Sequence, residues 1–136
     1  MVTEDYVSFE TAKLLKEKGF DDVCHAFYDK DGIFINFLQF VGNSNFKGVN
    51  EEKITFAPTL QMTVKWLRKK GFHVFVPLEI DYDEDERGDK WYHDATYYPE
   101  IRRVSDGKIM YDDGALYATP EQAYKVAIRY CLENLI

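Results

Sequence analysis

Residues 57–82 constrain the fold more than any other part of the chain, because they combine one complete helix with one long strand. Pro58 suits the first turn of a helix, where its missing N–H is not needed, and Gly71 ends that helix. From Phe72 to Tyr82, apolar residues alternate with other residues. Strict alternation predicts a strand with one buried face. The segment therefore predicts a helix at 58–70, followed directly by a strand at 72–82.

The helix and the strand of this segment are expected to pack against each other. Apolar residues at helical spacing form the stripe that a helix buries, and alternate residues of a strand share one face. Pro77 cannot donate a ladder hydrogen bond, so the strand is expected at a sheet edge or with a bulge at that point. The residues predicted to meet in the core are Leu60, Val64, Leu67, Val74, Val76 and Leu78.

The rest of the chain supplies two more helices and further strands. Ser8 suits the N-cap of a helix at 9–18, and Thr119 with Pro120 starts a helix that runs to about Asn134. Turns with glycine favour antiparallel pairing of the strands. The sequence predicts one α+β domain over residues 1–136, with the order α-β-β-α-β-β-β-α and a mostly antiparallel sheet packed by helices. The remaining expected strands are 23–28, 33–41, 90–98 with its continuation 101–104, and 109–111.

The composition is that of one folded domain. The chain has 136 residues, of which 46% are hydrophobic, so it can bury one core. No segment approaches the roughly 20 consecutive apolar residues of a membrane span, and the N-terminus lacks the basic-then-apolar run of a secretory signal. We therefore expect a cytoplasmic protein with no membrane partner. Cys24 and Cys131 are expected to be buried, reduced thiols, with a bridge between them as the alternative.

The net charge of −7 argues against a nucleic-acid-binding surface, which needs clustered lysine and arginine. Residues 58–134 follow the α-β-β-β-α order of double-stranded-RNA-binding domains, which is an analogy of fold alone. Such domains need lysines at the start of the final helix, where this chain has Thr119, Pro120 and Glu121. Nucleic acid is therefore not expected as a partner.

The acidic segment at 81–89 matches a calcium-binding loop only at its start. Carboxylates occupy its first, third and fifth positions, but glycine falls at the eighth position where the sixth is needed. Tyr92 stands where a bidentate glutamate belongs. We interpret the segment as a solvated hairpin turn, and we expect neither a metal site nor a cofactor.

No motif marks catalytic chemistry. His25, His73 and His93 lack the paired spacing of metal-binding histidines. His93 and Asp94 are neighbours in a predicted strand, so their side chains point to opposite faces and cannot easily pair. No catalytic residue is predicted, and the chain is interpreted as a protein that is not an enzyme.

Three separated stretches look familiar: residues 11–20, residues 57–68 and residues 127–136. Together they resemble small proteins of gut Bacteroidetes and their phages, a family with no assigned activity. The resemblance implies cytoplasmic expression and a phage or mobile element as one candidate source. It brings no catalytic or binding residues with it.

The aromatic strand at 90–98 carries the candidate binding residues. Tyrosine and tryptophan combine a large contact area with a polar group, so they can mark a binding face. By alternation, Tyr92, Asp94, Thr96 and Tyr98 share one face of this strand and form the candidate interaction face. An ordinary half-exposed sheet face is the alternative interpretation.

The favoured hypothesis is a non-enzymatic interaction protein, whose acidic, tyrosine-rich sheet face binds a protein partner or a second copy of the chain. The alternative is a small-ligand-binding domain with a pocket between the sheet and the helix at 58–70. An enzyme of unidentified type comes third. The long polar loop expected at 42–55 is either a solvated connector or a functional segment.

Overall fold

The computed structural model describes residues 3–36 and 53–136, which form a single small α+β domain with several antiparallel sheets. The expected fold class and the three expected helices are confirmed. The helices are α1 (Phe9–Glu17), α2 (Leu60–Lys69) and α3 (Pro120–Asn134). The strands are β1 (Ala26–Tyr28), β2 (Phe34–Asn36), β3 (Thr55–Phe56), β4 (Phe72–Phe75), β5 (Leu78–Glu84), β6 (Lys90–Tyr97), β7 (Glu100–Arg103) and β8 (Ile109–Tyr111).

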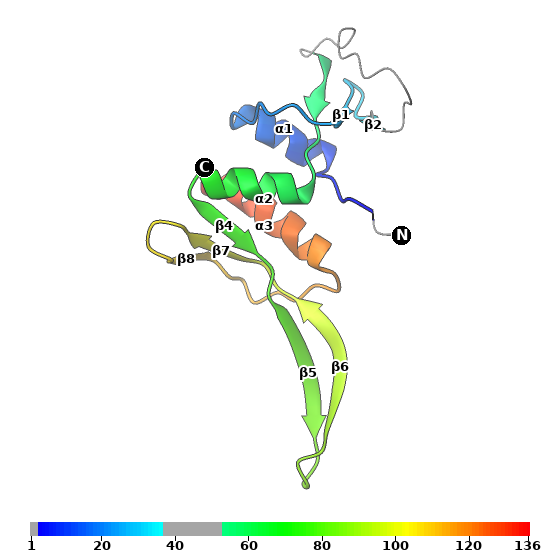
Figure 1. The fold of residues 1–136 in the computed structure, drawn as a ribbon, viewed down its shortest axis with the longest axis vertical. Helices are drawn as coiled ribbons and strands as arrows, with labels where there is room; N and C mark the ends of the chain where they lie inside the picture. Colours follow the sequence, from blue (N-terminus) through cyan, green and yellow to red (C-terminus); the bar gives the residue numbers. More distant parts are fainter. Residues whose placement is uncertain (1–2, 37–52) are drawn as a thin grey trace.

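The molecule is elongated, with the helices in the middle (Figure 1). One sheet, in the order β2-β1-β3, lies beside α1 at one end. A second sheet, in the order β4-β7-β8, lies on the other side of the helices. The third sheet is the two-stranded β5–β6 hairpin, which projects away from this body and forms the far end of the molecule.

Each helix begins at a hydroxyl side chain that accepts a hydrogen bond from the backbone N–H three residues later. The N-caps are Ser8, Thr59 and Thr119. Such a cap satisfies one of the N–H groups that the first helical turn leaves without a partner. The expected caps at Ser8 and Thr119 are confirmed, whereas Pro58 lies before the N-cap of α2 and outside its first turn.

One hydrophobic cluster joins the three helices to the β4–β7–β8 sheet. It buries the stripe that the helical spacing predicted on α2, together with Val74 of β4. Burial of aliphatic side chains is the main source of stability in a domain of this size. The fully buried members with the largest side chains are Val7, Leu15, Leu67, Val74, Ile101, Ile128 and Leu132.

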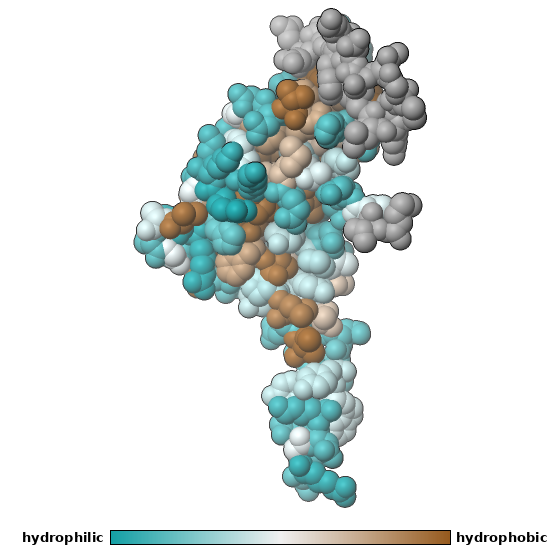
Figure 2. Space-filling view, in the orientation of Figure 1, coloured by the Kyte–Doolittle hydropathy of each residue, from teal (hydrophilic) through white to brown (hydrophobic). Residues whose placement is uncertain are grey.

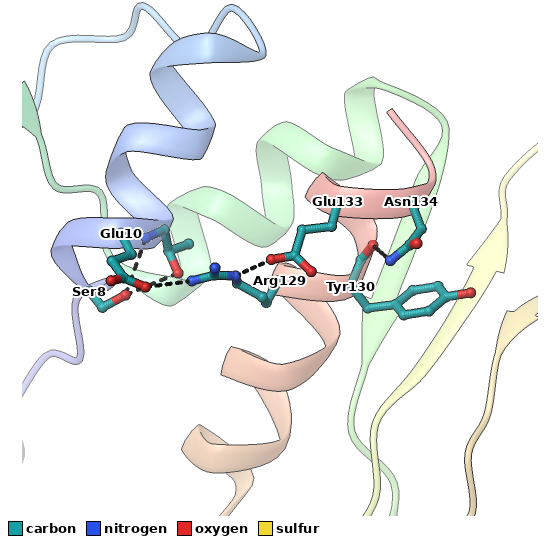
Figure 3. A network of polar contacts seen from close by, with 7 residues as sticks. Ser8, Glu10, Arg129, Tyr130, Glu133 and Asn134 are labelled. Atoms are coloured by element: carbon teal, nitrogen blue, oxygen red, sulfur yellow. Dashed lines mark hydrogen bonds and ion pairs between the residues drawn. The ribbon is translucent and has the colours of Figure 1, made fainter.

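Exposed polar contacts also join α1 to α3. Arg129 of α3 lies between two carboxylates, one from each helix (Figure 3). Its Nη1 is 3.3 Å from Glu10 Oε2, and its Nε donates to Glu133. Exposed ion pairs of this kind each contribute about 0–1 kcal/mol. The buried cluster, and not this exposed network, therefore holds the two helices together.

The prediction of a single strand at 72–82 is wrong in one respect. The segment is interrupted at Val76 and Pro77 and forms two strands that belong to different sheets. Phe75 pairs with Glu100 in the body, and the next pair is Leu78 with Tyr97 in the hairpin. Each chain segment has two residues between these pairs, so the register continues across the break. Leu78 is 53% exposed, so its predicted place in the core is wrong, and Val76 lies between the two strands.

The strand expected at 33–41 is also different. Its described part is β2, which pairs with β1 at the edge of a sheet, so within residues 3–36 and 53–136 the central strand is β1. Apolar residues on both faces of the segment 33–41 favour a covered strand, but Phe34 is 41% exposed. Residues 37–41, and most of the loop expected at 42–55, lie outside the described residues. Thr55 and Phe56 form β3, which the sequence did not predict.

Both cysteines are free and buried, as expected. Burial raises the pKa of the Cys24 thiol to about 11, with a smaller contribution from Asp22, and burial raises the pKa of Cys131 to about 12. Since the thiolate is the reactive form, we expect neither thiol to react with a thiol-specific dye at about pH 8 until the protein unfolds. Absorbance after mixing, with and without denaturant, measures this. Rapid labelling of the native protein would contradict the buried placement.

Candidate interaction hairpin

The β5–β6 hairpin, residues 78–97 with their turn, is the least buried part of the fold that the structure describes. Every residue of β5 is exposed, and none of β6 is buried. A two-stranded ribbon has no second layer, so neither of its faces is covered by the body (Figure 1). An isolated hairpin of two strands is only marginally stable in water. Core formation therefore does not explain why this ribbon carries large apolar side chains.

A β-bulge in β6 decides which side chains share a face. Ile80 pairs with Ala95, but the next pair is Tyr82 with Tyr92, so Asp81 alone stands opposite two residues of β6. Such a bulge shifts the alternation by one residue on the bulged strand. Tyr92 is thereby brought to the face of Tyr82, and the ring centroids of the two tyrosines lie 5.9 Å apart.

The bulge creates one continuous apolar face along the ribbon. The residues of this face are largely exposed to solvent: Leu78 is 53% exposed, Ile80 46%, Tyr82 48% and Tyr92 68%. Figure 2 shows hydrophobic surface near the base of the projecting ribbon and hydrophilic surface at its tip. We call this set the apolar hairpin face; it consists of Leu78, Ile80, Tyr82, Tyr92, Ala95 and Tyr97.

The opposite face of the ribbon is mostly polar and acidic, with the exposed Trp91 opposite Asp83 near the tip. Glu79, Asp81 and Asp83 alternate with the apolar residues of β5, and Thr96 lies opposite Glu79. His93 Nε2 is 2.7 Å from Asp83 Oδ2, and both side chains are more than half exposed. His93 thus pairs across the strands instead of with Asp94, in agreement with the prediction that these neighbours cannot easily pair.

The tip of the hairpin is ordered by its own hydrogen bonds. Asp85 Oδ1 accepts from the backbone N–H groups of Arg87 and Asp89, each at 2.9 Å. Aspartate commonly stabilises turns in this way. Among residues 3–36 and 53–136, no group of three or more histidine, cysteine, aspartate or glutamate side chains is arranged to hold a metal ion.

The four residues of the predicted interaction face all lie on or beside the hairpin, but they do not share one face. Asp94 and Thr96 lie on the acidic face, and the bulge moves Tyr92 to the apolar one. Tyr98 lies at the base, half-buried, where its N–H donates to Pro77 O at 3.3 Å. The structure therefore brings Tyr92 together with Tyr82 and Ile80, which sequence reasoning had assigned to the strand that packs under α2.

Two prolines mark the joint between hairpin and body. Pro77 precedes β5 and Pro99 follows β6. Pro77 accepts from Tyr98 but has no N–H to return the second bond of the pair, so the ladder is interrupted there. Beside the joint, Tyr97 and Tyr117 exchange two backbone hydrogen bonds of 2.9 and 2.7 Å. A proline near the base of each strand was the sequence signal for a separate ribbon.

The α2–β4 contact and the pockets beside the helices are weaker candidates for a functional site than the hairpin. The contact between α2 and β4 is filled by buried side chains such as Leu67 and Val74. A pocket of about 400 Å³ lies instead between α1 and β3, lined by Lys16, Phe20 and Ile54 among others. Lys16 Nζ there already donates to Ile54 O. Among the described residues that line this pocket, Lys16 and Asp21 are the ionisable side chains, and none is a histidine, cysteine, serine, threonine or tyrosine.

Tyr111 lines a second pocket, of about 420 Å³, beside α3. Its hydroxyl donates to Asp113 Oδ2 at 2.5 Å, and its ring stacks on Tyr130 with the centroids 4.1 Å apart. Burial, followed by the bond to Asp113, raises the pKa of Tyr111. A phenol whose pKa is raised is a weaker source of phenolate at neutral pH, so this arrangement favours a structural role over catalysis.

Comparisons of the chain with known proteins give no further information. In the part of the chain that the structure describes, every helix is too short or too polar to cross a bilayer. Comparisons with protein families, with curated proteins and with solved structures found no match.

Proposed function

We propose that this chain is a non-enzymatic protein-interaction protein and that the apolar hairpin face is its docking surface. The observation that carries the proposal is the row of large apolar side chains on a projecting ribbon, with Leu78, Ile80, Tyr82 and Tyr92 each about half exposed or more. Contiguous exposed apolar side chains on a folded protein mark interaction sites more often than scattered ones do.

The residue types of this face suit protein binding. Tyrosine rings give a large, stiff contact area with a polar end, and such residues carry much of the energy at protein interfaces. Tyr82 and Tyr92 already contact each other, so part of the side-chain freedom that binding would remove is already restricted. A partner packed on the apolar hairpin face would also supply the second layer that a two-stranded ribbon lacks.

Site-specific photo-crosslinking in the cells that naturally carry the gene tests the proposal. A photoreactive phenylalanine analogue replaces Tyr92, and the matched control carries it in place of Val104, an apolar residue of the body that is 55% exposed. We expect a discrete adduct from position 92 and none from position 104. The mass of the adduct distinguishes a different protein from a second copy of the chain.

A variant that lacks two large side chains of the apolar hairpin face completes this test. Serine in place of both Tyr82 and Ile80 should abolish the adduct from position 92, while the thermal midpoint stays within a few degrees because surface substitutions rarely exceed about 0.5 kcal/mol each. Equal crosslinking from positions 92 and 104, or an adduct that survives both substitutions, would refute the proposed docking surface.

A further inference from the structure

Resting on the proposed function, we infer that the partner presents a basic protein surface, with an apolar floor for the hairpin face and lysine or arginine side chains at its rim. The inference concerns the chemistry of the partner, which the apolar side chains do not specify. It follows from the distribution of charge over the hairpin.

The hairpin carries almost all of the net charge of the chain. Residues 78–97 include eight acidic residues against Arg87 and Lys90, so they hold six of the seven net negative charges. The remainder of the chain is close to neutral. A charge concentrated on one projecting element is an asymmetry that steers association with partners of the opposite charge.

The acidic side chains of the ribbon are largely left without counter-charges. Among the described residues, His93 is the one basic side chain within 4 Å of a hairpin carboxylate, that of Asp83. Lys90 lies over the ring of Tyr82, 4.6 Å from its centroid. Glu79 and Asp81 lie on the face opposite the apolar one, and no lysine, arginine or histidine of residues 3–36 and 53–136 forms an ion pair with either. These carboxylates lie behind the apolar hairpin face, so the rim of a groove that encloses the ribbon would bring cations of a partner to them.

Charge also decides between the possible occupants. Two hairpins with six net negative charges each would repel when packed face to face, which opposes a second copy of the chain. Nucleic acid and anionic lipid carry dense negative charge and are opposed for the same reason. A basic protein surface is the occupant that gains from both the apolar side chains and the carboxylates.

Two synthetic peptides provide the probe. Both have the same alternating apolar residues, with lysine at the polar positions of one and glutamate at those of the other. We expect the fluorescently labelled lysine peptide to bind, with a Kd that rises about tenfold between low and high salt as the charges are screened. The glutamate peptide should bind at least about tenfold more weakly.

Charge-neutralising variants locate the effect. The substitutions Glu79→Gln, Asp81→Asn and Asp83→Asn together should raise the Kd of the lysine peptide about tenfold. The matched control removes the same charge from the body by Glu4→Gln, Asp21→Asn and Asp22→Asn, three exposed residues, and should change the Kd by less than about twofold.

The outcomes separate this inference from the proposed function. If Tyr82→Ser with Ile80→Ser weakens peptide binding but the hairpin neutral variant does not, the docking surface stands and the basic partner is refuted. Failure of the lysine peptide to bind, equal binding of both peptides, or equal effects of the two charge variants also overturns the inference. A hairpin-dependent dimer in sedimentation would show that the occupant is a second copy.

Discussion

Replacing Leu67 by alanine is expected to lower the free energy of unfolding by about 2–5 kcal/mol. The Leu67 side chain is fully buried within the cluster that joins α2 to the β4–β7–β8 sheet and α3. Truncation loses the burial of the removed atoms and leaves a cavity that the neighbouring helices can fill only in part. Urea denaturation followed by circular dichroism measures the loss.

Met62→Ala is the matched control for Leu67→Ala. Met62 belongs to the same helix, but its side chain is 38% exposed. Alanine also favours the helix, so the cost at this position should stay below about 1 kcal/mol. Equal losses for the two variants would mean that α2 does not bury the face assigned to it here.

Replacing Gly32 by alanine is expected to destabilise the protein by about 2–4 kcal/mol, through a backbone effect and a contact effect together. Gly32 has a φ of +81°, a conformation that L-residues other than glycine rarely adopt. A Cβ at this position would lie 2.7 Å from Cδ2 of Phe9, well inside van der Waals contact. Alanine would therefore push the first residue of α1 away from the β1–β2 turn.

Gly107→Ala separates the two effects. Gly107 has a φ of +73°, but a Cβ there meets no atom within 4 Å. Its substitution should cost only the backbone part, about 1–2 kcal/mol. In addition, Phe9→Leu should recover part of the loss in the Gly32→Ala background, because the two sites are in contact and are not additive. Equal losses for both glycines, with no recovery, would argue against the contact with Phe9.

The helices could be predicted because their signals are local. Ser8 and Thr119 are caps that act within three residues, and the apolar stripe of α2 is visible without knowledge of its partner. Gly71, with a φ of +103°, ends α2 as expected, and β4 begins at the next residue, Phe72. In these cases the residues that form the sequence motif are also the residues that make the local structural contact.

The antiparallel hairpin and its solvated turn could be predicted, but the exposure and facing of its side chains could not, because they depend on pairing. Alternation from Phe72 to Tyr82 shows that one face is apolar, but it does not show whether a helix or another protein covers that face. Val74 packs in the core and Leu78 does not, although both obey the same pattern. The bulge at His93 and Asp94 leaves no signature in the sequence of a single strand, so the face of Tyr92 could not be assigned.

The continuous register across the two prolines has a consequence for the dimensions of the molecule. The β4–β7 ladder and the β5–β6 ladder belong to one interrupted hairpin, in which the same pairing holds on both sides of the joint. Each strand advances about 3.3 Å per residue, and its side chains return to the same face every two residues. Removing two residues from each strand beyond the joint would therefore shorten the ribbon by about 7 Å while every remaining side chain keeps its side. The length of the β5–β6 ribbon can thus change in steps of two residues per strand without any change to the body that carries it.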